Sequence, residues 1–122
     1  SQDQLDWLFS LKKHRRFLDA KFRLCLVHHH LMRMPYDIGK ISPLEMGMKL
    51  KNANAVMDTC VDIGIDAMFN GHRHHGYMVR LPGYPIIVSS PSSTLGCKSS
   101  KALYMWQIDL SRRVPIADTI PL

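Results

Sequence analysis

Hydrophobic positions recur at two spacings along the chain, and each spacing predicts a different kind of element. Residues 3–17 predict an amphipathic helix, because apolar side chains recur on one face and a basic run forms the far end. A second helix is predicted over residues 50–63, with Gly64 as its stop. Its inner face is expected to comprise Ala53, Val56, Met57, Cys60 and Val61.

Short apolar runs predict the strands. Two of them, residues 22–27 and 65–69, are separated by the second helix. Further strands are predicted over residues 77–81, 85–89, 102–109 and 113–120, the last at an edge. Pro82 and Gly83 indicate a turn. The nearly unbroken apolar pattern of residues 102–109 predicts burial on both faces.

The order of these elements predicts an α/β fold with a mixed sheet. The chain has 122 residues, enough for one small domain, and its composition of 46% apolar and 21% charged residues is typical of globular proteins. No run approaches the ~20 apolar residues that span a bilayer, so no membrane partner is expected. The odd number of cysteines, three, does not predict a disulfide framework and indicates a reducing compartment, so we expect a cytoplasmic protein.

The chain is basic, with a formal net charge of +6 from 16 Lys and Arg against 10 Asp and Glu residues. Its densest basic run is Lys12-Lys13-His14-Arg15-Arg16. Such a balance favours anionic partners such as phosphates or nucleic acid. The solvated face of a helix would explain the same run, so both interpretations stay open.

Histidines end two of the predicted strands. His28-His29-His30 follows residues 22–27, and Gly71-His72-Arg73-His74 follows residues 65–69. Ligands commonly bind at the carboxyl edge of open α/β sheets, and neutral imidazole is the commonest metal ligand. Gly71 allows a sharp turn after its strand. The two histidine clusters therefore predict a metal site at one edge of the sheet.

With these motifs in this order, the chain resembles the C-terminal half of a calcineurin-like metallophosphoesterase. The likeness rests on residues 24–30, the helix that begins near Leu50 and residues 66–74, and it extends over residues 2–110. Residues 88–94 resemble the Ser/Thr-rich segment of that family's cyclic-nucleotide phosphodiesterase branch. The resemblance implies a metallophosphoesterase-type α/β/β/α sandwich.

The resemblance also implies roles for individual residues. His28 would ligate one metal ion together with His72, and His74 would ligate its neighbour. His29 is the alternative to His28 and, with Arg73, would otherwise contact the substrate. The cofactors would be two divalent ions of Mn, Fe, Zn or Co. The reaction would be hydrolysis of a phosphate ester such as a nucleotide phosphodiester, by a hydroxide that the two cations activate.

The family's upstream motifs, Asp-x-His, Gly-Asp-x-x-Asp and Gly-Asn-His-Asp/Glu, do not occur in this sequence. They supply the family's bridging carboxylate, Asn ligand and catalytic His, and two cations without a carboxylate between them repel. We therefore expect residues 1–122 to be the C-terminal segment of a single domain whose N-terminal metal-binding half is absent. That half or a second chain would be the partner, and an uncovered sheet would also favour a homodimer.

Three alternatives remain. An inactive or split phosphoesterase half would bind a partner without catalysis, and a nucleic-acid-binding module would use the basic run. A single-metal enzyme with three His ligands would keep water at its open position. Oligomeric state, the salt dependence of binding and the metal content distinguish these readings.

Overall fold

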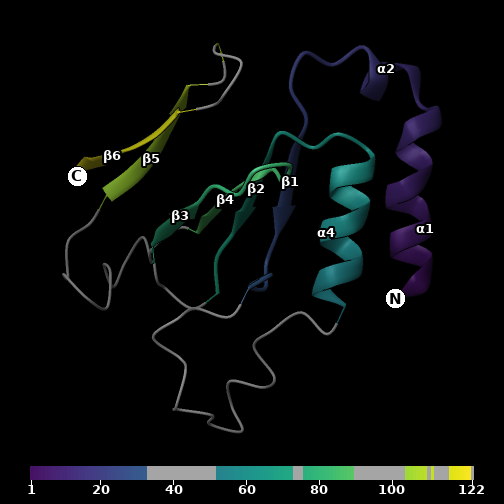
Figure 1. Cartoon of the computed structure of the whole chain (residues 1–122), viewed down its shortest axis with the longest axis horizontal. Helices are drawn as coiled ribbons and strands as arrows, with labels where there is room; N and C mark the ends of the chain where they lie inside the picture. The colour runs from purple at the N-terminus through teal and green to yellow at the C-terminus, as the bar shows by residue number, and fades with distance from the viewer. Residues whose placement is uncertain (33–51, 73–75, 90–103, 110, 112–115, 122) are drawn as a thin grey trace, which may run out of the picture.

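The computed structural model describes residues 1–32, 52–72, 76–89, 104–109, 111 and 116–121. It combines helices with a four-stranded mixed sheet, so the predicted α/β class and mixed sheet are confirmed. Helices α1 (Gln2–Ser10) and α4 (Ala53–Asp62) lie on one side of this sheet (Figure 1). The hairpin of β5 (Tyr104–Asp109) and β6 (Ile116–Pro121) lies on the other side.

The N-terminal segment forms separate helices, so the single helix predicted over residues 3–17 is wrong. After α1 come the 3-10 helix η1 (Leu11–Lys13) and the short helix α2 (Arg15–Leu18), separated by an extended residue, His14 (φ −88°, ψ 115°). A continuous helix turns ~100° per residue and would carry Leu11 and Phe17 about 120° apart. Because the chain breaks at His14, both side chains pack against the same core.

Arg23, just before strand β1 (Leu24–Val27), ties the short helix α2 to the end of α4. Its guanidinium donates to three carbonyl oxygens, those of Phe17 (2.9 Å), Leu18 (2.9 Å) and Gly64 (3.3 Å). The last carbonyls of a helix have no partner within the helix. The Arg23 side chain therefore serves as a shared cap between two segments far apart in the sequence.

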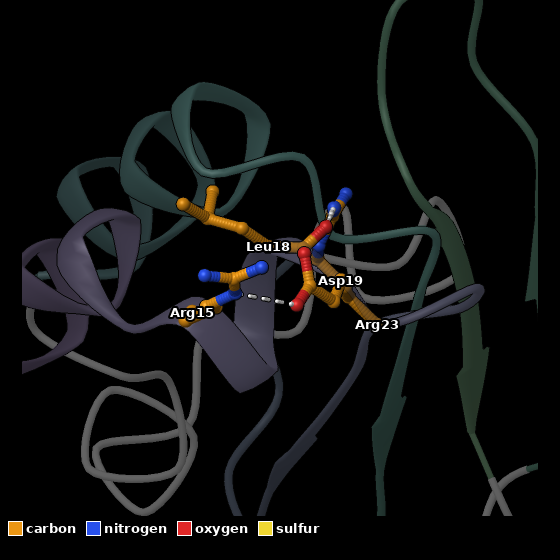
Figure 2. Close-up of polar contacts among 4 residues, drawn as sticks. All are labelled: Arg15, Leu18, Asp19 and Arg23. Carbon is orange, nitrogen blue, oxygen red and sulfur yellow. Dashed lines mark hydrogen bonds and ion pairs between the residues drawn. The ribbon is translucent and has the colours of Figure 1, made fainter.

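Figure 2 contrasts this cap with a neighbouring surface ion pair. Arg23 lies beside the backbone of Leu18, whereas Arg15 Nε lies 3.4 Å from Asp19 Oδ2. The Arg15 and Asp19 side chains are 93% and 68% exposed. Exposed ion pairs contribute little to stability, ~0–1 kcal/mol. Of the two arginines, we expect Arg23 to matter more for the fold.

Helix α4 ends at Asp62, and Gly64 terminates it as predicted. The Gly64 amide donates to Val61 O (3.1 Å) and the Ile65 amide donates to Cys60 O (2.9 Å), which together form a Schellman motif. Gly64 has φ +75°, a conformation that glycine adopts without steric cost. Of the five residues predicted on the inner face, three are buried, namely Ala53, Met57 and Cys60. The prediction that Val61 lies on the inner face is wrong, because its side chain is 38% exposed. Val61 follows Cys60 directly, and one residue along a helix turns the side chain by ~100°.

The main sheet has the strand order β1-β2-β4-β3. Strands β1, β2 (Ala67–Asn70) and β4 (Ile86–Ser89) run parallel, and β3 (Tyr77–Val79) is antiparallel to β4. The starts of β1 and β2 are joined twice: the Arg23 amide donates to Asp66 Oδ2 (2.7 Å), and the Asp66 amide donates to Arg23 O (2.8 Å). These bonds set the register Val27↔Asn70, so both strands end at the same edge.

The turn predicted at Pro82 and Gly83 is confirmed. The Tyr84 amide donates to Leu81 O (3.1 Å), and Gly83 has φ +79°. Proline followed by a glycine with positive φ is the signature of a type II turn. This turn joins β3 to β4 and returns the chain to the centre of the sheet.

Alternation along the strands divides the core into two sides. The side facing α4 includes Cys25, Val27, Met68 and Ile87. On the side facing the hairpin, Trp106 and Ile108 pack against Ala67, Ile86 and Val88. Trp106 Nε1 also donates to Ser89 O (2.9 Å) and fastens the hairpin to β4.

The terminal strand predicted over residues 113–120 is found as β6, which pairs antiparallel with β5. The prediction that residues 102–109 are buried on both faces is wrong for the side chains that the structure describes. Met105 is 51% exposed, whereas its neighbour Trp106 is half-buried against the sheet. The two-stranded hairpin therefore covers the sheet with one face.

Candidate functional site

Two histidine segments meet at the carboxyl edge of the sheet. His28 and His29 directly follow Val27, the last residue of β1, and His72 follows β2 after Gly71. Because β1 and β2 are parallel and in register to their last residues, the two segments leave the sheet side by side. The Gly71 amide also donates to His28 O (3.3 Å). The structure thus brings together residues 44 positions apart, as the motif order predicted.

The three imidazole rings form a compact cluster, which we call the histidine cluster (His28, His29 and His72). The ring centres of His28 and His72 lie 4.6 Å apart, with an interplanar angle of 63°. The ring of His29 lies 4.8 Å from that of His72 and 5.0 Å from that of His28. His28 and His72 are exposed and His29 is half-buried, so the cluster is open to solvent.

His72 reaches this cluster through an unusual backbone conformation. Its φ is +73°, and among the described residues it is the one non-glycine residue with a positive φ. A residue held in this region costs on the order of 1–3 kcal/mol, and such residues occur often at functional sites. Gly71 just before it has open space around its Cα, since an added Cβ would meet nothing within 4 Å.

A shallow hollow of about 330 Å³ adjoins the cluster. It lies across the ends of β1 and β2 and is lined by Leu26, Val27, His28, Phe69, Asn70 and Gly71. Most of this lining is apolar, and the His28 ring supplies its one ionisable group. The hollow offers space beside His28 for a small ligand.

The third histidine of the run, His30, points into the protein. It is 1% exposed, and its Nδ1 lies 3.0 Å from Tyr77 Oη. Tyr77 Oη in turn accepts a hydrogen bond from Asn70 Nδ2 (3.3 Å). Sequence reasoning missed this buried polar group, because three consecutive histidines carry no signal of which one is buried.

The described residues contain part of the predicted ligand set. Arg73 and His74 lie outside them, so the structure tests neither residue. Within the part of the chain that is described, no group of three or more His, Cys, Asp or Glu side chains is arranged to hold a metal ion. The structure brings the rings of His28 and His72 together, and their role as metal ligands stays a prediction.

No known family profile matches the chain, and no curated protein sequence matches it either. Among the described helices, none has the length and apolar character needed to cross a membrane.

Proposed function

We propose that this chain forms the histidine side of the active centre of a metal-dependent phosphoesterase that hydrolyses phosphodiesters. The observation that carries the proposal is the contact between the rings of His28 and His72, which come from the ends of two neighbouring parallel strands. Convergent polar groups at such an edge are the usual arrangement of α/β binding sites.

The donor chemistry fits a borderline divalent cation such as Mn, Fe, Zn or Co. Two imidazoles that bind one ion at ~2.1 Å have ring centres roughly 5 Å apart. The 4.6 Å between the His28 and His72 rings is close to that separation. His74 would ligate the neighbouring ion. The bridging carboxylate would come from the N-terminal half of the same domain or from a second chain.

Two bound cations would supply an activated hydroxide and offset the charge that develops on the phosphoryl group. The chain's own residues would orient the ions and the substrate. His28 directly follows β1 and His72 lies two residues after β2, so the two rings would already be close together before a cation binds. His29 is the third member of this cluster and would donate a hydrogen bond to a phosphate oxygen. Arg73, between two ligands in the sequence, would bind such an oxygen pair bidentately.

The exposed edge of the sheet supports the need for a partner. In the described sheet β1 is an outer strand, and its Leu24 and Leu26 are 51% and 82% exposed. Fully burying a leucine side chain contributes about 1.5–3 kcal/mol. A second half, or a second copy of this chain, would bury these residues and complete the α/β/β/α sandwich. The hairpin β5–β6, already packed on the same sheet, would belong to its second layer.

Cation binding to the purified chain tests this proposal. We expect Mn²⁺ or Zn²⁺ affinity, measured by isothermal titration, to fall at least about tenfold in His28→Ala and His72→Ala. His14→Ala is the matched control, since His14 is exposed on a different segment. Any metal-dependent phosphodiester hydrolysis should be lost in His72→Ala and His74→Ala. Equal cation affinity in all these proteins would overturn the metal assignment.

A second candidate function is nucleic-acid binding by an otherwise inactive half. It is favoured by the exposure of the whole basic run, Lys12, Lys13, His14, Arg15 and Arg16. Binding through phosphates weakens steeply as salt rises. Affinity for an oligonucleotide that falls with salt and with Lys12→Ala/Lys13→Ala, but is unchanged in His72→Ala, would favour this function over the phosphoesterase.

We propose that the protein is cytoplasmic. Its odd number of cysteines, three, does not suggest a disulfide framework, which favours a reducing compartment. Fusion to a fluorescent protein and imaging of the cell would test this location directly.

A further inference from the structure

A buried polar group lies at the carboxyl edge of the sheet, and we call it the tyrosine bridge (His30, Asn70 and Tyr77). At its centre is the Tyr77 hydroxyl, whose Oη lies 3.0 Å from His30 Nδ1 and accepts a hydrogen bond from Asn70 Nδ2 (3.3 Å). The rings of His30 and Tyr77 have centres 5.6 Å apart. His30 and Asn70 are 1% and 4% exposed. A buried polar group costs stability when it loses a partner, so these bonds oppose any separation of the three residues.

The direction of each bond follows from what the groups can offer. A tyrosine hydroxyl has one proton to donate and can also accept, and Asn70 supplies the proton on one side. The hydroxyl's own proton is then available to His30 Nδ1, which accepts it in the neutral tautomer that carries its proton on Nε2. Both bonds therefore depend on one oxygen atom, and a phenylalanine at residue 77 would break both.

The tyrosine bridge spans the sheet from its outer strand β3 to the segment that follows β1 at the opposite edge. Tyr77, the first residue of β3, pairs with Ser89 of β4, and Ser89 also pairs with Asn70 of β2. The side chains of directly opposed residues lie on the same face of a sheet. The Tyr77 side chain thus reaches across β4 to β2, past Ser89, which has a small side chain and is 0% exposed.

The bridge joins the two segments that carry the histidine cluster. His30 is the second residue after His28, and Asn70 is the second residue before His72. His72 has a φ of +73°, and a strained conformation of this kind persists only where the surrounding structure enforces it. Bonds from Tyr77 to His30 and to Asn70 restrain the chain close to both ligand candidates.

We infer that Tyr77 is a positioning residue for the histidine cluster. Its hydroxyl keeps residues 28–30 and 70–72 at the separation at which the ring centres of His28 and His72 lie 4.6 Å apart. This ring separation belongs to the metal-free chain, whereas its consequence for a cation rests on the proposed function. Two imidazoles that are already in place lose less conformational freedom when they bind an ion.

Tyr77→Phe tests the inference, because it removes one oxygen and keeps the ring that packs against the core. The first measurement is NMR of the metal-free chain, since rings with centres 4.6 to 5.0 Å apart give nuclear Overhauser effects between their protons. We expect the effects between His28 and His72 to weaken or vanish in Tyr77→Phe. Tyr84→Phe is the matched control and should keep them, because Tyr84 is exposed in the turn before β4.

The second measurement is the affinity for Mn²⁺ or Zn²⁺ by isothermal titration. Loss of a residue that orients metal ligands typically lowers the affinity 10–100-fold, and we expect about tenfold in Tyr77→Phe. Tyr84→Phe should bind like the parent chain. A parent chain that binds neither cation, but whose ring contacts are lost in Tyr77→Phe, would support the positioning role and refute the phosphoesterase proposal instead.

Asn70→Ala is the second variant, because it cuts the bridge at β2 and leaves Tyr77 intact. It should weaken the same ring contacts, and circular dichroism and urea unfolding check that each variant is folded. Contacts between the His28 and His72 rings that persist in folded Tyr77→Phe would overturn the positioning role, whatever the cation affinity. If Tyr77→Phe does not fold, contacts that persist in Asn70→Ala would overturn it equally, as would their absence from the parent chain.

Discussion

At the scale of single residues, His72 has a strained backbone conformation, and its ring belongs to the histidine cluster. Its φ of +73° is a conformation that glycine would adopt more easily, yet a histidine occupies it. The ring it carries contacts both His28 and His29. Strained residues occur often at functional sites, so this conformation is consistent with the ligand role proposed for His72. The strain and the proposed ligand role can be separated by comparing two substitutions.

His72→Gly is expected to be more stable than His72→Ala by about 1 kcal/mol, because glycine removes the strain that alanine keeps. Both variants remove the imidazole and should bind Mn²⁺ or Zn²⁺ equally weakly. Urea unfolding measures the first difference and isothermal titration the second. An alanine variant that is as stable as the glycine variant would contradict the strain at this position.

At the scale of elements, long-range hydrogen bonds decide how the helices sit on the sheet. Arg23 connects the end of α2 to the loop after α4, and its backbone pairs with Asp66 at the start of β2. Trp106 plays a similar part for the hairpin through Ser89 O. The contacts of Arg23 with Gly64 and Asp66 and that of Trp106 with Ser89 join residues 17 to 43 positions apart, so they stabilise the packing of elements rather than the elements themselves.

Arg23→Ala should lower the free energy of unfolding by about 1–3 kcal/mol, since three carbonyl oxygens lose a charged donor. The matched control is Arg15→Ala, which removes an exposed ion pair and should change stability by less than about 0.5 kcal/mol. Chemical denaturation of the two variants and the parent chain gives both values. Equal losses would mean that the Arg23 side chain contributes no more than a surface charge.

At the scale of the whole molecule, the sheet is covered unevenly. Helices cover one side and the hairpin covers part of the other, but Leu24 and Leu26 on β1 stay exposed. An outer strand with apolar side chains is a template for pairing with another chain. We therefore expect the isolated chain to associate as its concentration rises.

Leu26→Lys should reduce this association several-fold, because a charge on an edge strand opposes pairing. Leu81→Lys, at a residue that is 40% exposed in the β3–β4 connection, is the control and should associate like the parent chain. Sedimentation velocity over a range of concentrations reports the mass. Association that survives Leu26→Lys unchanged would place the contact on another surface.

Local preferences in the sequence determined the elements near the site. The positions of β1, α4 and β2, the stop at Gly64 and the turn at Pro82 and Gly83 all follow from short-range spacing and from glycine and proline geometry. The parallel arrangement of β1 and β2 follows from the helix between them. The clustering of His28 with His72 could therefore be predicted from the order of the motifs alone.

Only the tertiary structure decided which face each residue takes. Periodicity could not show that the N-terminal helix breaks at His14. The break lets Phe17 pack against the core, and its partners there lie far along the chain. Nor could it show that His30 turns inward to Tyr77 while His29 joins the cluster. These outcomes depend on contacts between distant segments, and such contacts form only when the sheet and its helices pack together.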